Sequence, residues 1–145
     1  MDRAAVDRLI GLLELDARMI ARAFGLEYRA IQPERAGVRR RLGVCYRDGT
    51  IRIRLFHAST GRPLKYSSLI DTLCHELAHL RHFNHGARFQ AFYRRILEHA
   101  RRQGIYRPGR EAAAVVSDRP PLVRRREVGG RAGAALRGPQ QLALF

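Results

Sequence analysis

The chain has 145 residues, of which 28 are Lys or Arg and 13 are Asp or Glu, and its formal net charge is +15. That length suits one domain of about 100 to 150 residues and excludes a second independent one. A hydrophobic share of 46% excludes disorder throughout. The two cysteines cannot form the disulfide framework of a small secreted protein, and no run approaches the roughly 20 apolar residues of a membrane span. We therefore expect a cytoplasmic protein with no membrane partner.

The first half of the chain predicts a helix and then strands. Apolar residues at helical spacing, closed by Gly25, predict an amphipathic helix over residues 3–24. Residues 26–31 alternate weakly and predict a short strand. Apolar and basic residues then alternate on both sides of Asp48-Gly49, a pair typical of a tight hairpin turn. The hairpin is expected to have one buried and one basic face.

The second half predicts two helices. Ser68 and Asp71 resemble a capping box, and the leucines that follow predict a helix over residues 69–82. Another amphipathic stretch begins near Phe89 and ends near Gly104. The expected fold class is α+β: an N-terminal helix, a small three-stranded antiparallel or mixed sheet, a helix that carries the active site and a supporting C-terminal helix.

The end of the chain differs in composition from the rest. It carries Pro120-Pro121, Gly129-Gly130 and a run of arginines, with little apolar periodicity. Such a segment lacks the apolar surface needed to offset the entropy lost on folding. We therefore expect a domain over residues 1–107 and a basic, largely disordered tail over residues 108–145.

The motif His75-Glu76-Leu77-Ala78-His79 carries the chemistry of the predicted site. Residues four apart on a helix share one face and lie about 6 Å apart along its axis, so both histidines can bind one metal ion. Glu76 would lie beside the ion, where a general base can take a proton from metal-activated water. A chance histidine pair is the alternative, since short motifs arise by accident.

A catalytic zinc ion needs a third protein ligand and leaves its fourth position to water. His82, His85 and Glu98 are the candidates. His82 lies one turn too far along the helix, and Glu98 is expected to face solvent. His85 follows the helix where the chain can turn back, so we predict His75, His79 and His85 as the zinc ligands.

Several segments together resemble the SprT-like zinc metallopeptidases and the neighbouring YgjP type. They are the strand Gly43-Val44-Cys45, the hairpin around Asp48-Gly49, the histidine helix and Asn84-His85-Gly86. The resemblance implies a minigluzincin-like fold, with zinc on the three histidines and Glu76 as the catalytic acid. It also implies protein or peptide substrates. Relatives that cleave proteins crosslinked to DNA, and the excess of basic residues, make DNA a candidate partner through the arginine-rich surface and tail.

Two other functions compete with a metallopeptidase. One is a nucleic-acid-binding module with a structural metal site, although such zinc sites normally take four protein ligands and favour cysteine. The other is a metal-dependent nucleotide hydrolase in which Arg52 and Arg54 grip the phosphates. The residue that stabilises the oxyanion stays open among four candidates: Tyr46, Tyr66, Tyr93 and His82.

Overall fold

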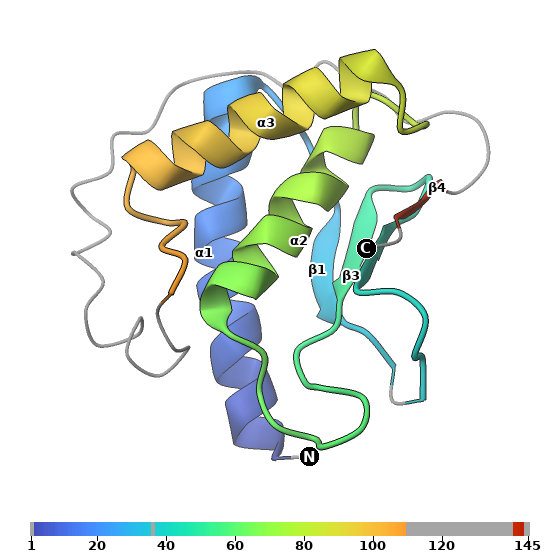
Figure 1. Ribbon diagram of the computed structural model, residues 1–145, viewed down its shortest axis with the longest axis vertical. Coiled ribbons are helices and arrows are strands. Elements are labelled where there is room, and N and C mark those ends of the chain that lie inside the picture. The colour runs from blue at the N-terminus through green and yellow to red at the C-terminus, as the bar shows by residue number, and fades with distance from the viewer. Residues whose placement is uncertain (1, 36, 110–140, 144–145) are drawn as a thin grey trace.

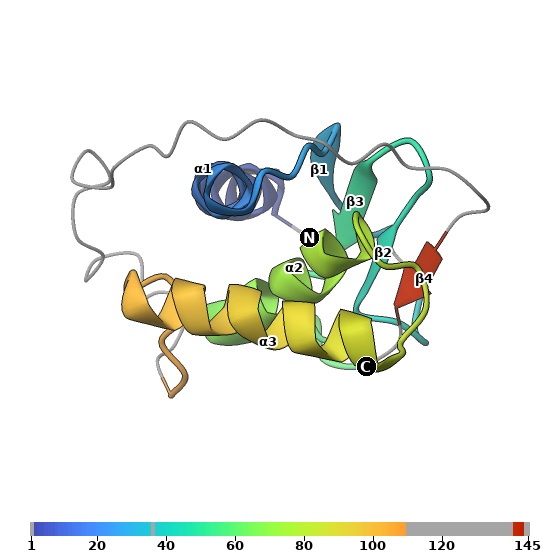
Figure 2. The ribbon, with the colours of Figure 1, turned by 90° about the horizontal axis from the view of Figure 1, so that it is seen from above.

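The computed structural model describes residues 2–35, 37–109 and 141–143 and has an α+β architecture (Figure 1). Its elements, in chain order, are α1 (Arg3–Phe24), β1 (Ala30–Pro33), β2 (Gly43–Cys45), β3 (Thr50–Ile53), α2 (Tyr66–His79), α3 (Ala87–Arg102) and β4 (Gln141–Ala143). The helices lie to one side of the sheet, with α2 nearest to its centre (Figure 2). The predicted fold class is confirmed.

Helix α1 has the predicted ends. The Asp2 side chain caps its first turn by accepting a hydrogen bond from the Ala4 N–H at 3.1 Å. Gly25 ends it in the left-handed conformation at φ 66°, which glycine adopts without steric penalty. Local sequence signals therefore determine this helix.

Helix α2 begins three residues earlier than predicted and ends at His79. The predicted capping box is wrong, because the residue before the helix is Lys65 and no side chain caps it. Asp71 instead accepts a hydrogen bond from the Tyr93 hydroxyl of α3. Tyr66, the first helical residue, is fully buried and donates to Asp16 of α1. Tertiary packing therefore sets the start of α2.

The strand order in the sheet is β1-β3-β2-β4. Strands β2 and β3 form the predicted hairpin, whose turn contains Gly49 at φ 94°, and β1 pairs parallel to β3. Ile51 and Ile53 are fully buried, whereas Arg52 between them is only partly buried. The sheet thus has one apolar face toward the helices.

Strand β4 pairs antiparallel with β2 and was not predicted, because its three residues fall in the expected tail. Residues 110–140 and 144–145 of the expected tail lie outside the described residues. The predicted domain boundary therefore stays a prediction. No helix in the described part of the chain is long and apolar enough to cross a bilayer. The cytoplasmic location stays a prediction.

Helix α2 lies at the centre of the core. It contacts α1, α3, β2 and β3, and its leucines Leu69, Leu73 and Leu77 are fully buried. A helix packed on several sides has little freedom to shift, because close-packed interiors leave few voids. The last turn of α2 is therefore a rigid platform for the side chains it carries.

Candidate metal centre

The last turn of α2 brings together His75, Glu76 and His79. Their exposed fractions are 5%, 0% and 0%, so three polar side chains are withdrawn from solvent at one place. The two imidazole ring centroids lie 4.9 Å apart. The predicted helical spacing therefore does place both rings on one face.

His85 completes the cluster from the segment between α2 and α3. Its Nε2 atom lies 3.1 Å from Nε2 of His79, and its ring centroid lies 5.2 Å from that of His75. One ligand nitrogen from each histidine lies within 4.8 Å of the others. Two nitrogens bound tetrahedrally to zinc at about 2.0–2.1 Å would be about 3.3 Å apart. The 3.1 Å between the Nε2 atoms of His79 and His85 is close to that value. The three predicted ligands thus form a group that can hold a metal ion.

The backbone of His82 orients the ring of His79. Nδ1 of His79 lies 2.9 Å from the His82 carbonyl oxygen. A carbonyl only accepts, so Nδ1 carries the hydrogen and Nε2 keeps its lone pair toward His85. The ring of His82 instead packs edge-on against Phe92 at 5.7 Å. His82 therefore supports the site through its main chain.

Helix α3 supplies an aromatic wall behind the imidazoles. The ring of Phe89 stacks on that of His79 at 4.3 Å and meets His75 edge-on at 4.8 Å. Tyr93 lies 5.2 Å from His75, and its hydroxyl donates to Asp71. These contacts restrict the imidazole rings to one orientation, which favours ligand binding because less entropy is lost.

Burial keeps the two helical histidines neutral. Burial, together with the nearby imidazoles of His79 and His85, lowers the pKa of His75 to about 3. Burial likewise lowers the pKa of His79 to about 4, although its hydrogen bond to the His82 carbonyl opposes the shift. Neutral imidazole is the form that binds a metal ion, so neither ring has to lose a proton near pH 7.

Glu76 is a fully buried carboxyl group. Among the residues that the structure describes, none bonds to either of its oxygens, and Nδ1 of His75 is 3.5 Å from Oε2. Burial raises its pKa well above the usual range, and the charge of Arg41 opposes this shift. An unpaired buried carboxylate is unfavourable, and a divalent cation beside it would lower its pKa again. The environment of Glu76 therefore fits a cation on the adjacent histidines.

Gly43 lets β2 run directly against this carboxylate. A β-carbon at Gly43 would lie 2.7 Å from Cγ2 of Thr72 and 3.0 Å from Oε2 of Glu76. Such contacts are too short for any side chain, so only glycine fits without a shift. This role of Gly43 was not predicted. A glycine inside a predicted strand was the available signal, because it often marks a close backbone approach.

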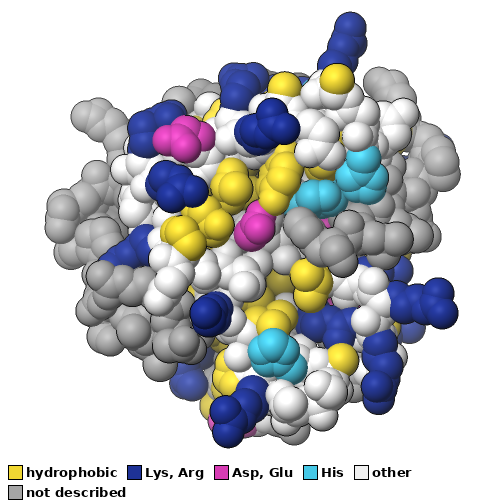
Figure 3. Space-filling model, in the orientation of Figure 1, with side chains coloured by type: hydrophobic (Ala, Val, Ile, Leu, Met, Phe, Trp, Pro, Cys, Tyr) yellow, Lys and Arg dark blue, Asp and Glu magenta, His cyan; other side chains and the backbone are white. Residues whose placement is uncertain are grey.

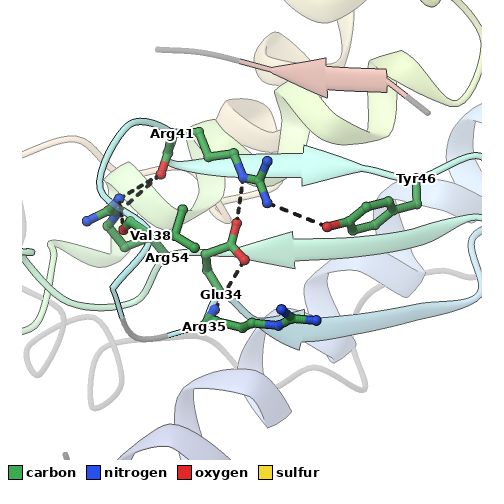
Figure 4. A network of polar contacts seen from close by, with 6 residues as sticks. All are labelled: Glu34, Arg35, Val38, Arg41, Tyr46 and Arg54. Carbon is green, nitrogen blue, oxygen red and sulfur yellow. Dashed lines mark hydrogen bonds and ion pairs between the residues drawn. The ribbon is translucent and has the colours of Figure 1, made fainter. Parts of the chain in front are cut away.

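An ion pair next to the site joins the residue that follows β1 to the segment before β2 (Figure 4). Nε of Arg41 lies 2.9 Å from Oε2 of Glu34, whose side chain is 2% exposed. The guanidinium of Arg41 also donates to the Tyr46 hydroxyl at 3.5 Å. The positive charge that moderates the pKa of Glu76 is thus held in a fixed place.

Several other candidates do not join the site. The guanidinium of Arg54 donates to the carbonyl oxygens of Val38 and Arg41, so it holds a loop and is not free to grip a nucleotide. Glu98 is exposed and lies 3.7 Å from the guanidinium groups of Arg101 and Arg102, as expected of a residue that faces solvent.

Tyr66 is also removed from the list of oxyanion stabilisers. It is fully buried at the first residue of α2, the opposite end of the helix from His79, and donates a 2.6 Å hydrogen bond to Asp16. Tyr93 is the candidate whose ring contacts His75, one of the predicted ligands. Nothing in the sequence distinguished these two tyrosines, because the contacts of both depend on tertiary packing.

Comparison with known families gives the domain an identity. The model of the WLM domain matches residues 33–117, more than half of the chain. The chain belongs to the WLM domain family. The match contains the β2–β3 hairpin, α2 with its histidines, His85 and α3. No curated protein and no solved structure matches the chain.

The resemblance to SprT-like and YgjP-type peptidases is wrong, because the matching family is the WLM domain. The segments behind that resemblance were a glycine-containing strand, a hairpin, the histidine helix and a third histidine. The WLM match over residues 33–117 contains the same segments, so they do not separate one such family from another. The WLM domain is linked to zinc and to metallopeptidase activity, and membership is compatible with a metal-dependent hydrolase.

Proposed function

We propose that this WLM domain is a zinc metallopeptidase in which His75, His79 and His85 hold the metal and Glu76 is the general base. One observation carries the proposal: three imidazole nitrogens converge within 4.8 Å beside a buried carboxyl group that has no hydrogen-bond partner among the described residues. Three histidines are the ligand set of a catalytic zinc site, which keeps one position open.

The residues have separate tasks in the proposed reaction. A bound zinc ion would polarise the scissile carbonyl and acidify the attacking water. Glu76 accepts the proton of that water and passes it to the leaving amine, which a rigidly held carboxyl can do in both directions. His75 and His79 are buried and fix the geometry, whereas His85 is exposed and leaves the site open on that side.

A purely structural metal site fits less well. In the described part of the chain, the group that could hold an ion has three members and contains no cysteine. Both cysteines, Cys45 and Cys74, are buried free thiols whose pKa is raised by burial, which disfavours the thiolate that binds zinc. A structural site would also give no reason for a buried Glu76 carboxyl that no described residue hydrogen-bonds.

Proteins or peptides are the proposed substrates, and DNA is a proposed anionic partner. The support for DNA is the net charge of +15 and the Lys and Arg side chains spread over the face that carries α2 and α3 (Figure 3). Binding through phosphate contacts would weaken steeply as salt rises. DNA affinity measured at low and at physiological salt tests this partner. An affinity independent of salt would contradict DNA binding through phosphate contacts.

Removal of the metal tests the enzymatic proposal. An unstructured protein is incubated with the full chain as purified, after chelation and after zinc is added back. We expect cleavage that chelation abolishes and zinc restores, with peptide-bond products identified by mass spectrometry. The same preparations are given nucleoside triphosphates as a second substrate class. Zinc-dependent nucleotide turnover without protein cleavage would overturn the peptidase in favour of the nucleotide hydrolase.

A further inference from the structure

The backbone of β2 presents hydrogen-bonding groups on both of its edges. The Tyr46 N–H donates to the Thr50 carbonyl at 2.8 Å, and the Arg54 N–H donates to the Leu42 carbonyl at 2.8 Å. Residues 42 and 46 therefore direct their backbone groups toward β3. Because this direction alternates along a strand, Gly43 and Cys45 direct theirs to the opposite edge.

Strand β4 occupies that opposite edge. Gly43 lies opposite Ala143, and Cys45 lies opposite Gln141, so both are the hydrogen-bonded pairs of this antiparallel ladder. Strand β4 also contacts α2, the helix that carries the histidines (Figures 1 and 2). Its residues lie beyond the part of the chain that the family match covers, which ends at residue 117. The occupant of the edge is thus separate from the matched domain.

The paired edge passes beside the proposed general base. Gly43 is the position whose β-carbon would lie 3.0 Å from Oε2 of Glu76. Neighbouring strands are about 4.7–4.9 Å apart, so the backbone of Ala143 lies one strand spacing beyond Gly43. An extended chain on this edge therefore pairs with the strand residue that lies against the Glu76 carboxylate.

We propose that residues 141–143 are an intramolecular competitor, which must leave the β2 edge before another polypeptide can pair there. Strand addition depends on main-chain hydrogen bonds and so tolerates many sequences. A strand of three residues pairs weakly, while the covalent connection keeps its effective concentration high. Occupation by β4 does not depend on catalysis, but its role as a competitor rests on the proposed peptidase function.

Two proline variants test the pairing itself in the full chain. Gln141→Pro with Ala143→Pro removes both N–H groups of β4 that point to β2, whereas Leu142→Pro removes one that points away. Amide hydrogen exchange followed by NMR should show Gly43 and Cys45 protected in the wild type and in Leu142→Pro. In the double variant we expect exchange at both amides to be about tenfold faster or more, since a short strand is only marginally stable. Equal exchange in all three proteins would overturn the pairing.

The same proteins separate the competitor from the peptidase. With zinc and an unstructured protein substrate, the double variant should have a lower KM than the wild type and an unchanged kcat, while Leu142→Pro should match the wild type. If exchange changes but KM does not, β4 pairs without competing and the proposal is overturned. If no protein cleaves the substrate, the peptidase function fails, and the exchange result still decides whether β4 occupies the edge.

Discussion

Asp16 in α1 and Glu76 in α2 are both carboxyl residues with no exposed surface, yet their surroundings differ. Asp16 accepts a 2.6 Å hydrogen bond from Tyr66, which ties α1 to the first turn of α2. Glu76, at the other end of α2, has no such bond from any described residue and lies beside two buried histidines. One end of α2 is thus held by a hydrogen bond between side chains, whereas at the other end the Glu76 carboxyl receives none from any described residue.

The difference separates a stabilising region from a functional one. A buried polar group that is hydrogen-bonded contributes to stability, whereas an unpaired one lowers it. Unfavourable arrangements of this kind persist where function requires them, and groups with strongly shifted pKa values concentrate at such sites. The comparison predicts that changes at Asp16 act on folding and changes at Glu76 act on activity.

The largest expected effect is on turnover by Glu76→Gln. Loss of the general base should lower kcat by about 10²- to 10⁴-fold, because amide nitrogen cannot accept the proton. Asp16→Asn should retain the kcat of the folded fraction. Steady-state kinetics on a peptide substrate measures both, with exposed Glu98→Gln as the control. A Glu76→Gln protein with the wild-type kcat would contradict the assignment of Glu76 as the general base.

Zinc should stabilise the folded chain through the histidine cluster. At a free concentration 100 times its Kd, a ligand that binds only the folded state adds about 2.7 kcal/mol to the free energy of unfolding. We expect this gain in the wild type and its loss in His85→Ala, which removes an exposed ligand without disturbing the core. Thermal unfolding with and without zinc measures the gain. His57→Ala, outside the cluster, should keep it, and a gain that survives in His85→Ala would contradict the ligand set.

At the other end of α2, Asp16→Asn should lower the free energy of unfolding by about 1–3 kcal/mol, because it weakens a buried hydrogen bond to a charged group. Glu76→Gln should leave this free energy unchanged or raise it, since it replaces an unpaired buried carboxyl by a neutral amide. Urea unfolding of both variants in metal-free buffer measures the contrast. Tyr66→Phe combined with Asp16→Asn should be less than additive, and additive losses would mean that the two side chains do not interact.

The smallest expected effect comes from Gly43→Ala. The new methyl group must displace Thr72 or the Glu76 carboxylate by a few tenths of an ångström, and we expect activity to fall roughly tenfold with zinc still bound. Gly11→Ala is the matched control, because a β-carbon there meets nothing within 4 Å. That variant should keep full activity and gain helix stability. Equal activity of the two variants would show that Gly43 does not position Glu76.

Local patterns in the sequence predicted much of this molecule. Helix α1 has its expected ends, because a capping aspartate and a left-handed glycine act within one turn. His75 and His79 share a face because of helical geometry, and His85 lies close enough in the sequence to turn back to them. Each of these predictions uses residues within a few positions of one another.

Such local patterns could not predict contacts between residues that are distant in the sequence. The bond between Tyr66 and Asp16 joins residues 50 positions apart and moves the start of α2 away from the predicted capping box. The pairing of β4 with β2 places Gly43 opposite Ala143, 100 positions later in the sequence. The family was also assigned wrongly, because the strand, hairpin and histidine helix behind that assignment are equally contained in the WLM match.

Zinc content tests the central claim most directly. The full chain and its variants are purified, loaded with zinc, dialysed and analysed for bound metal. We predict about one zinc ion per chain for the wild type, for Glu76→Gln and for His82→Ala, because His82 supports His79 only through its backbone. His75→Ala, His79→Ala and His85→Ala should each lose most of it. Full zinc content in the His85 variant, or its loss in the His82 variant, would contradict the three-histidine site.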